Sequence, residues 1–337
     1  MRASVVLLGF GLAASAAVLL SALWWPADAL AAWLAAAVAL ASVPAGALIL
    51  VMMMRLIPGA WGEMLRLSGE AAALTTPVAA LAFLPLFFAL AWLYPWVTKP
   101  PPSAFAAWWL STPGFVIRTV AWFVYLGWCG WAMLGRRRTG VSAAIGLVLM
   151  PVLVHFVAVD WLMSRDLDFA SSAFGLQMVS IMTTIAFCAL LLLRHGAGER
   201  EIRTGVLGAL LLTLLLIWAY LNFMAYLIVW SGNLPGPVGW YAMRGGSWSI
   251  ALVAVMALNG VPLILLLFRR LRSSPGLLAL LAGAVLGGKL IELMWFAIPP
   301  AGGLAALLGL LAMAGAVSLM AGLLPLALRR RVESRSA

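Results

Sequence analysis

The chain has few of the side chains that hold metals and redox groups. Its 337 residues include two histidines, two cysteines and ten acidic residues. Cys129 and Cys188 form no C-x-x-C or C-x-x-C-H motif, which excludes the usual ligand sets of an iron–sulfur cluster and a c-type haem. A b-type haem in a helical bundle usually takes two histidines, but His195 adjoins Arg194, so only His155 lies within an apolar stretch. The sequence therefore predicts no haem, iron–sulfur or metal ligands in this chain.

Apolar residues dominate the composition. Hydrophobic residues make up 65% of the chain, charged residues make up 9%, and the mean hydropathy is +1.10. A soluble domain cannot bury this much apolar surface, and the repeated apolar runs are of the length, about 18 residues or more, that crosses a membrane. Because the longest connection, near 97–112, is too short for a separate domain, residues 1–337 are expected to form one integral membrane domain. The expected fold class is all-α, since a helix satisfies its own backbone groups in lipid.

A window of about 20 residues predicts ten membrane-spanning helices. The first apolar run also fits a cleaved signal peptide, but its length of about twenty residues exceeds the usual signal core, which favours a span. The predicted spans lie near residues 4–24, 29–54, 74–95, 113–134, 140–162, 169–193, 205–230, 248–268, 276–298 and 302–328.

Basic residues are distributed unevenly over the predicted connections. The two termini and the even-numbered loops hold 16 of the 21 lysines and arginines, whereas the odd-numbered loops hold Lys99, Arg165 and Arg244. Loops rich in lysine and arginine stay on the cytoplasmic side, so both termini are predicted to be cytoplasmic. The net charge of +11 follows from this topology and does not indicate a nucleic-acid partner.

Acidic residues gather at one predicted outer loop, in the segment HFVAVDWLMSRDLDFASSAFG at 155–175. Three of the ten acids in the chain, Asp160, Asp166 and Asp168, lie within nine positions there. On the predicted topology, Arg118 of the fourth span reaches a depth similar to that of Asp160. Buried charges in a membrane take partners, so we expect these two side chains to form an ion pair.

Two more charged side chains, Lys289 and Glu292, lie three positions apart in the ninth predicted span. This spacing places them on one helix face and predicts a second pair. All intramembrane charges found in this way belong to the outer half of the membrane, which indicates a polar cluster near the outer surface. Gln177, Ser180 and Thr184 form a polar stripe on the sixth span, which predicts either hydrogen bonds between helices or a polar path for protons.

Such a cluster suits a quinol, a hydrophobic carrier that exchanges protons together with electrons. Histidine can hydrogen-bond a quinone oxygen and carboxylates can accept protons, so the candidates are His155, Asp160, Asp166 and Asp168. Each candidate also has a structural interpretation. His155 follows Pro151 by four positions and would satisfy loosened backbone, and Asp160 would serve only in its ion pair. Asp166 and Asp168 would form a solvated loop or cap the sixth span.

Several segments resemble one family of membrane proteins. The stretch WLMSRDLDFASSAFG at 161–175 resembles the MSL(E/D)PHW(Y/F)ST-x-(F/Y)G motif of the NrfD/PsrC-like membrane subunits of alternative complex III, the bacterial quinol:cytochrome c oxidoreductase, and is most similar to the ActF-like subunit. Residues 59–96 are similar to its G-x-W-G, E-A-A and L-Y-P-W elements, and residues 115–123 to its arginine-bearing fourth span. Residues 217–248 are similar to its W-x-Y-x-x-F…IW-x-x-N-x-P…WY-x-x-R…W stretch, the most specific of these matches.

The resemblance implies an NrfD-like bundle in a bacterial inner membrane, in a subunit of a quinol-oxidising complex with a site for menaquinol or ubiquinol. The redox centres would lie on partners, namely a sister membrane subunit, a periplasmic iron–sulfur protein and multihaem cytochrome c subunits. Leu167 and Asp168 replace the proline and histidine of the family motif, so Asp168 would have to take over any role of that histidine. Two alternatives stay open: a scaffold or proton-path subunit without its own quinone site, and a secondary transporter.

Overall fold

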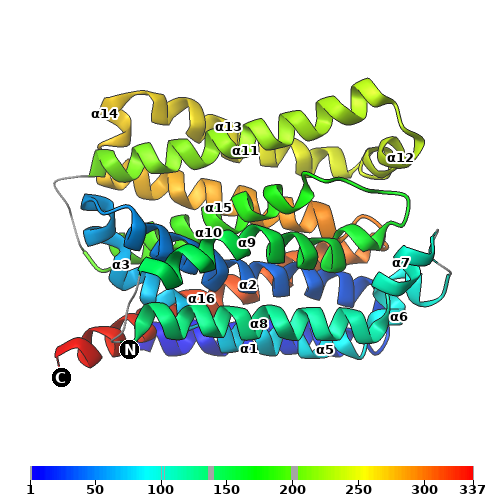
Figure 1. The fold of residues 1–337 in the computed structure, drawn as a ribbon, viewed down its shortest axis with the longest axis horizontal. Coiled ribbons are helices and arrows are strands. Elements are labelled where there is room, and N and C mark those ends of the chain that lie inside the picture. The colour runs from blue at the N-terminus through cyan, green and yellow to red at the C-terminus, as the bar shows by residue number, and fades with distance from the viewer. Residues whose placement is uncertain (1, 100, 102, 136–139, 199–203, 337) are drawn as a thin grey trace.

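Figure 1 shows the computed structural model, which describes residues 2–99, 101, 103–135, 140–198 and 204–336. Within these residues the chain is helical and contains no strand. Nine helices are long and apolar enough to cross a membrane, or ten if one bent pair counts as a single span. The chain is therefore an all-α, multi-pass membrane protein. The nine helices are α1 (Arg2–Ser21), α2 (Pro26–Leu56), α8 (Thr112–Leu134), α9 (Gly140–Trp161), α10 (Phe174–Gly196), α11 (Thr204–Gly232), α13 (Trp248–Leu267), α15 (Pro275–Ala297) and α16 (Leu304–Ser336).

The region predicted as one span at 74–95 is built differently. The apolar segment begins earlier, with the helix Ala60–Ala73, and a bend of 41° separates this first helix from those that start at Thr76. Pro77 and Pro85 stand in the first turns of two short helices, where a missing N–H costs no helical hydrogen bond. The hydropathy window missed the first helix because Arg66 and Glu70 lie within it. The elements are α3 (Ala60–Ala73), α4 (Thr76–Ala82), α5 (Leu84–Phe87), α6 (Leu90–Leu93) and the 3₁₀ turn η1 (Pro95–Val97).

Four further short elements complete the chain. Both termini and α14 lie at one end of the bundle, whereas α7 and α12 lie at the opposite end (Figure 1). This arrangement agrees with a common side for both termini. Residues 136–138, 200 and 203, which also entered the prediction of topology, lie outside the described residues. The short elements are α7 (Ala104–Trp109), η2 (Met163–Arg165), α12 (Pro235–Met243) and α14 (Arg269–Arg272).

The centre of the bundle is α2, an alanine-rich helix of 31 residues that is buried over most of its length. A helix that is apolar on all sides is typical of a position surrounded by other helices. Helices α10, α16, α3 and α9 pack around it. At Gly46 the packing is so close that a Cβ atom would collide with the carbonyl oxygen of Met182 in α10. A small residue therefore lets α10, which carries part of the candidate site, lie directly against the core.

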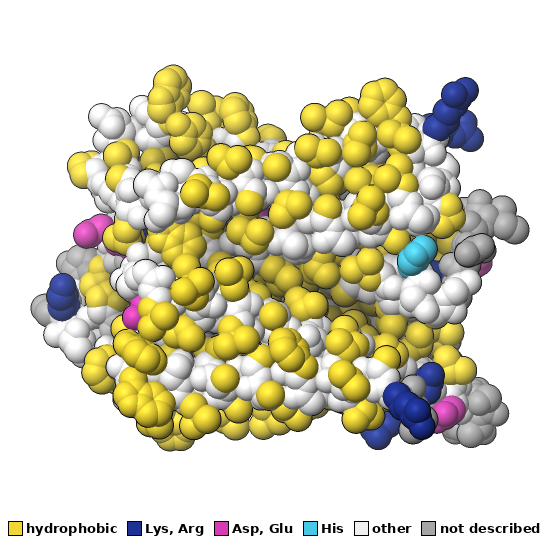
Figure 2. Space-filling model, turned by 180° about the vertical axis from the view of Figure 1, so that it is seen from behind, with side chains coloured by type: hydrophobic (Ala, Val, Ile, Leu, Met, Phe, Trp, Pro, Cys, Tyr) yellow, Lys and Arg dark blue, Asp and Glu magenta, His cyan; other side chains and the backbone are white. Residues whose placement is uncertain are grey.

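Apolar side chains also cover the outside of the bundle. Figure 2 shows hydrophobic side chains across one face, with Lys and Arg side chains at its ends. Ile250 and Val253 of α13 and Trp131 of α8 expose 75%, 67% and 76% of their surfaces. Exposed apolar surface of this extent is stable against lipid rather than water, so the bilayer covers these helices.

Candidate functional site

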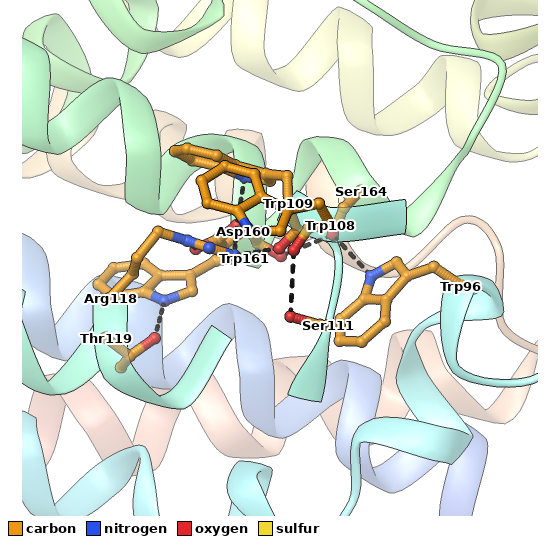
Figure 3. A network of polar contacts seen from close by, with 9 residues as sticks. All are labelled: Trp96, Trp108, Trp109, Ser111, Arg118, Thr119, Asp160, Trp161 and Ser164. Atoms are coloured by element: carbon orange, nitrogen blue, oxygen red, sulfur yellow. Dashed lines mark hydrogen bonds and ion pairs between the residues drawn. The ribbon is translucent and has the colours of Figure 1, made fainter. Parts of the chain in front are cut away.

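The predicted pair of Arg118 and Asp160 is confirmed (Figure 3). Nε of Arg118 in α8 donates to Oδ2 of Asp160 in α9 at 2.6 Å, and Nη2 donates to Oδ1 at 3.0 Å. The indole Nε1 of Trp109 in α7 donates to the same Oδ1 at 3.0 Å. The Asp160 side chain is 0% exposed. Its charge is thus buried with a bidentate partner, which is the arrangement that makes such burial tolerable.

The same cluster joins the chain segments at this end of the bundle. The Arg118 guanidinium lies 4.2 Å from the ring centre of Trp109 and donates to the Trp109 carbonyl at 2.8 Å. Ser164 donates to the Asp160 carbonyl at 2.7 Å and accepts from Nε1 of Trp96 at 3.1 Å. These contacts connect α7, α8, α9, η1 and η2. The geometry favours a structural role for the Asp160 carboxylate over proton transfer.

The other residues predicted to handle quinone and protons lie against a helix start and in a loop. His155 is half-buried and packs against Gly175, where a Cβ atom would collide with the imidazole. Asp166 accepts a hydrogen bond from the backbone N–H of Asp168 at 3.0 Å, and Asp168 is exposed. The N-cap residue of α10 is Ala173, and no side chain of the described residues caps this helix. The interpretation that Asp166 and Asp168 cap it is therefore wrong, because the helix begins later than expected.

The second predicted pair, Lys289 and Glu292 of α15, is also confirmed. Nζ of Lys289 donates to Oε2 of Glu292 at 3.0 Å, and the two side chains are 0% and 4% exposed. Trp218 of α11 donates from Nε1 to both carboxylate oxygens, at 2.8 and 3.0 Å, and its ring centre lies 3.7 Å from Nζ of Lys289. One indole therefore contacts both charges and fixes the carboxylate between α11 and α15.

Glu292 borders a cavity of about 320 Å³ between α10, α11, α13 and α15. This volume falls at the lower end of the range for small-molecule pockets, about 300–1,000 Å³. Gln177 of α10 and Asn222 of α11 bring side-chain amides to the wall, and Nε2 of Gln177 donates to Oδ1 of Asn222 at 3.3 Å. The aromatic side chains of the wall include Phe174, Trp218, Tyr226, Trp240, Trp295 and Phe296.

One hydrogen-bond donor on this wall has no partner in the part of the chain that the structure describes. Trp295 is 6% exposed, and within the described part of the chain its Nε1 makes no hydrogen bond. Buried polar atoms are nearly always paired, so this N–H is an unsatisfied donor on a residue that lines the cavity. The Ser180 hydroxyl is also unpaired among the described residues, but neither Ser180 nor Thr184 lines the cavity. Of the predicted polar stripe, Gln177 alone reaches it.

Arg244, next to α12, holds the end of this wall in place. Its guanidinium donates to the carbonyls of Trp240, Trp295 and Phe296 at 2.9, 3.0 and 3.0 Å and lies 3.6 Å from the ring centre of Trp240. Burial lowers the pKa of Arg244 to about 9, so the group stays cationic at neutral pH. Phe169 stacks on Trp240 with ring centres 4.3 Å apart. The acidic segment 155–175 thus contributes an aromatic ring, that of Phe169, to the cavity wall.

One buried acid lies at the opposite end of the bundle, which corrects the prediction that all intramembrane charges belong to the outer half. Glu70 of α3 is 0% exposed and pairs with Arg66 at 3.3 Å and with Arg331 of α16 at 2.8 Å. Arg331 also donates to the carbonyl of Leu134, the last residue of α8, at 2.9 Å. The prediction failed because this region becomes helical at Ala60, which places Glu70 inside a helix instead of a loop.

Sequence reasoning also missed Trp218, Asn222 and Trp295 as parts of the site. A usable signal was present, since Trp218 and Asn222 lie four positions apart on an otherwise apolar helix, and Asn222 also donates to the Trp218 carbonyl at 3.0 Å. Comparison with known proteins gives no match for this chain, either to a protein-family model or to a curated protein. The resemblance to NrfD/PsrC-like subunits therefore stays a prediction.

Proposed function

We propose that this chain is a quinol-binding membrane subunit of a quinol-oxidising respiratory electron-transfer complex. The observation that carries the proposal is the aromatic cavity, which has the Glu292 carboxylate at its border and an indole N–H, at Trp295, that no described residue pairs with. A quinol headgroup is a flat ring that carries oxygen atoms on opposite sides. Aromatic walls suit the ring, an N–H donor suits an oxygen, and a carboxylate suits a hydroxyl that must lose its proton.

Glu292 is the acid in the best position for this task. Its carboxylate lines the cavity and is already oriented by Trp218 and Lys289, so it needs no rearrangement when a ligand arrives. Gln177 and Asn222 offer amide groups on the same wall. Oxidation of a quinol releases protons as well as electrons, and in this proposal Glu292 accepts a proton while the electrons pass to a partner.

The position of the cavity supports release of protons on the outer side. Trp240 and Tyr241 of α12 line it, and α12 lies at the end opposite the two termini (Figure 1). The positive-inside distribution assigns that end to the outer face of a bacterial inner membrane. Protons that leave Glu292 in this direction enter the periplasm.

The family resemblance supports the wider assembly. Residues 217–248, the most specific of the matching segments, include Trp218, Asn222 and Trp240 on the cavity wall and Arg244 behind it. We therefore assign the electron acceptors to partners of the kind that this family uses, a periplasmic iron–sulfur protein and multihaem cytochrome c subunits beside a sister membrane subunit. Menaquinol and ubiquinol both suit the cavity chemistry.

The second candidate is a scaffold subunit without its own quinone site. The two closed ion pairs, Arg118 with Asp160 and Lys289 with Glu292, favour it, because each charge already has a partner and needs none from a ligand. In that case lipid would fill the cavity.

Titration of the purified chain with quinone separates the two candidates. Decylubiquinone and a short-chain menaquinone are added to the chain in nanodiscs, and tryptophan emission is followed, since a quinone beside Trp218, Trp240 and Trp295 quenches it. Trp295→Phe keeps an aromatic ring of smaller size, removes the N–H and is expected to weaken binding about tenfold. Trp122→Phe is the matched control, because Trp122 of α8 is buried, its Nε1 has no partner among the described residues, and it does not line the cavity. Absence of saturable quenching in the wild type, or equal losses in both variants, would support the scaffold.

A further inference from the structure

A second and larger cavity lies towards the opposite end of the bundle, and the proposed function does not use it. It is a groove of about 500 Å³ between α2, α10, α15 and α16. Small and aliphatic side chains form its wall, among them Val43, Ile185, Leu290 and Met320. Arg329 is the one charged residue among the described residues that line it.

The groove has the length of a lipid acyl chain. It follows α16 from Arg329 back to Ala316, a stretch of 14 residues, which corresponds to about 20 Å of helix. One leaflet contributes half of a hydrocarbon core of about 30 Å. The groove therefore extends from the level of the headgroups, where Gly196 and Ala197 also border it, to the middle of the bilayer.

The charge at its mouth indicates what kind of molecule it accepts. Arg329 is exposed and belongs to the basic run of residues 329–331 at the end of the bundle that holds both termini (Figure 1). A guanidinium forms paired hydrogen bonds with phosphate oxygens. A single cation above a long apolar groove matches a molecule with an anionic phosphate and an alkyl chain, and basic residues at this membrane surface attract anionic lipids.

We propose that the groove binds one anionic phospholipid of the cytoplasmic leaflet, with its phosphate at Arg329 and an acyl chain between α10, α15 and α16. The bound lipid fills space that the side chains leave open and connects α16 to helices on the other side of the groove. This site is separate from the quinol cavity, and neither proposal depends on the other.

The chain offers matched variants to test this site. Arg329→Glu reverses the charge at the mouth, whereas Arg330→Glu makes the same change at an exposed neighbour that does not line the groove. Ala321→Trp fills the groove from an exposed position on α16, so it perturbs the core little. Each protein is purified in mild detergent, checked for folding by its melting temperature and elution volume, and examined by native mass spectrometry with added phosphatidylglycerol or phosphatidylcholine.

The wild type is expected to retain phosphatidylglycerol in preference to phosphatidylcholine. Arg329→Glu should reduce retention by about tenfold or more, since it replaces an attractive charge by a repulsive one, while Arg330→Glu should retain the lipid as the wild type does. The Ala321→Trp protein should lose the lipid although its charge is unchanged, because the new side chain fills the groove. Equal behaviour of the two glutamate variants, or retention by the filled groove, would overturn the proposal. It would also be overturned if the bound molecule were an isoprenoid quinone or if a second copy of the chain occupied the groove.

Discussion

At the residue scale, Glu292 is the acid that links an ion pair to the cavity. Glu292→Gln removes the charge that compensates Lys289, which is fully buried, and is expected to destabilise the fold by about 3 kcal/mol. Combining it with Lys289→Gln should recover most of this loss, because no unpaired charge remains. Melting temperatures in detergent measure the effect on stability.

The double variant then separates structure from chemistry. If Glu292 accepts a proton, the complex that contains the stable double variant should assemble and yet oxidise quinol more slowly. Full turnover in this variant would remove Glu292 from proton handling and leave it as a structural partner of Lys289 and Trp218.

For the Arg118 and Asp160 pair, unlike Glu292, we expect an effect on stability and none on turnover. Arg118→Ala leaves the carboxylate of Asp160 buried with Trp109 as its remaining donor, which costs about 3–5 kcal/mol and lowers the amount of folded protein. Adding Asp160→Asn should partly restore it, and turnover per assembled complex should stay near that of the wild type. A double variant no more stable than the single one would show that the two side chains are not coupled.

At the element scale, the approach of α2 to α10 depends on Gly46. Gly46→Leu forces side-chain atoms against the Met182 carbonyl and is expected to cost about 3 kcal/mol, because a packed core does not absorb the added volume. Gly260→Leu in α13 is the control, since a Cβ atom at Gly260 meets nothing within 4 Å. The Gly46→Leu protein should melt at a lower temperature than the Gly260→Leu protein. Equal melting temperatures would mean that the contact between α2 and α10 contributes little to stability.

At the scale of the whole molecule, the two ends of the bundle carry different features. One end carries both termini, the Glu70 and Arg331 pair and the proposed lipid groove, and the other carries α7, α12 and the proposed quinol cavity. The predicted topology of ten spans with both termini inside would place the first end in the cytoplasm. Alkaline phosphatase fused after Ser336 should therefore be inactive, and fused within α12 it should be active. An active C-terminal fusion would reverse the orientation and place the cavity on the cytoplasmic side.

Much of the helical layout follows from local sequence, with exceptions that have clear causes. The long apolar runs correspond to helices because a bilayer leaves the backbone few other choices. The third run was misplaced because charged residues in α3 lower its hydropathy, and these residues are tolerated where Arg331 of α16 compensates Glu70. That compensation joins residues 261 positions apart in the sequence.

The candidate site was predictable only in part. Lys289 and Glu292 pair within one helix, so their spacing was enough, and the unusual cost of a charge in the membrane identified Arg118 and Asp160 as partners. Neither the spacing of residues nor the cost of buried charge predicted the cavity. Its donor, Trp295, has a side chain that is as common in a bilayer interface as in a binding site.

The sequence by itself determined that the chain lies in a lipid bilayer, that it is helical and that its basic residues are unevenly placed. Each of these properties depends on single segments and their contact with lipid or water. Tertiary structure decided which polar groups meet. Gln177, Asn222 and Glu292 belong to three different helices and reach one cavity. Helices that are apolar around most of their circumference carry little record of which face turns inward, so their rotation is set by packing against neighbours, as at Gly46 and Gly175.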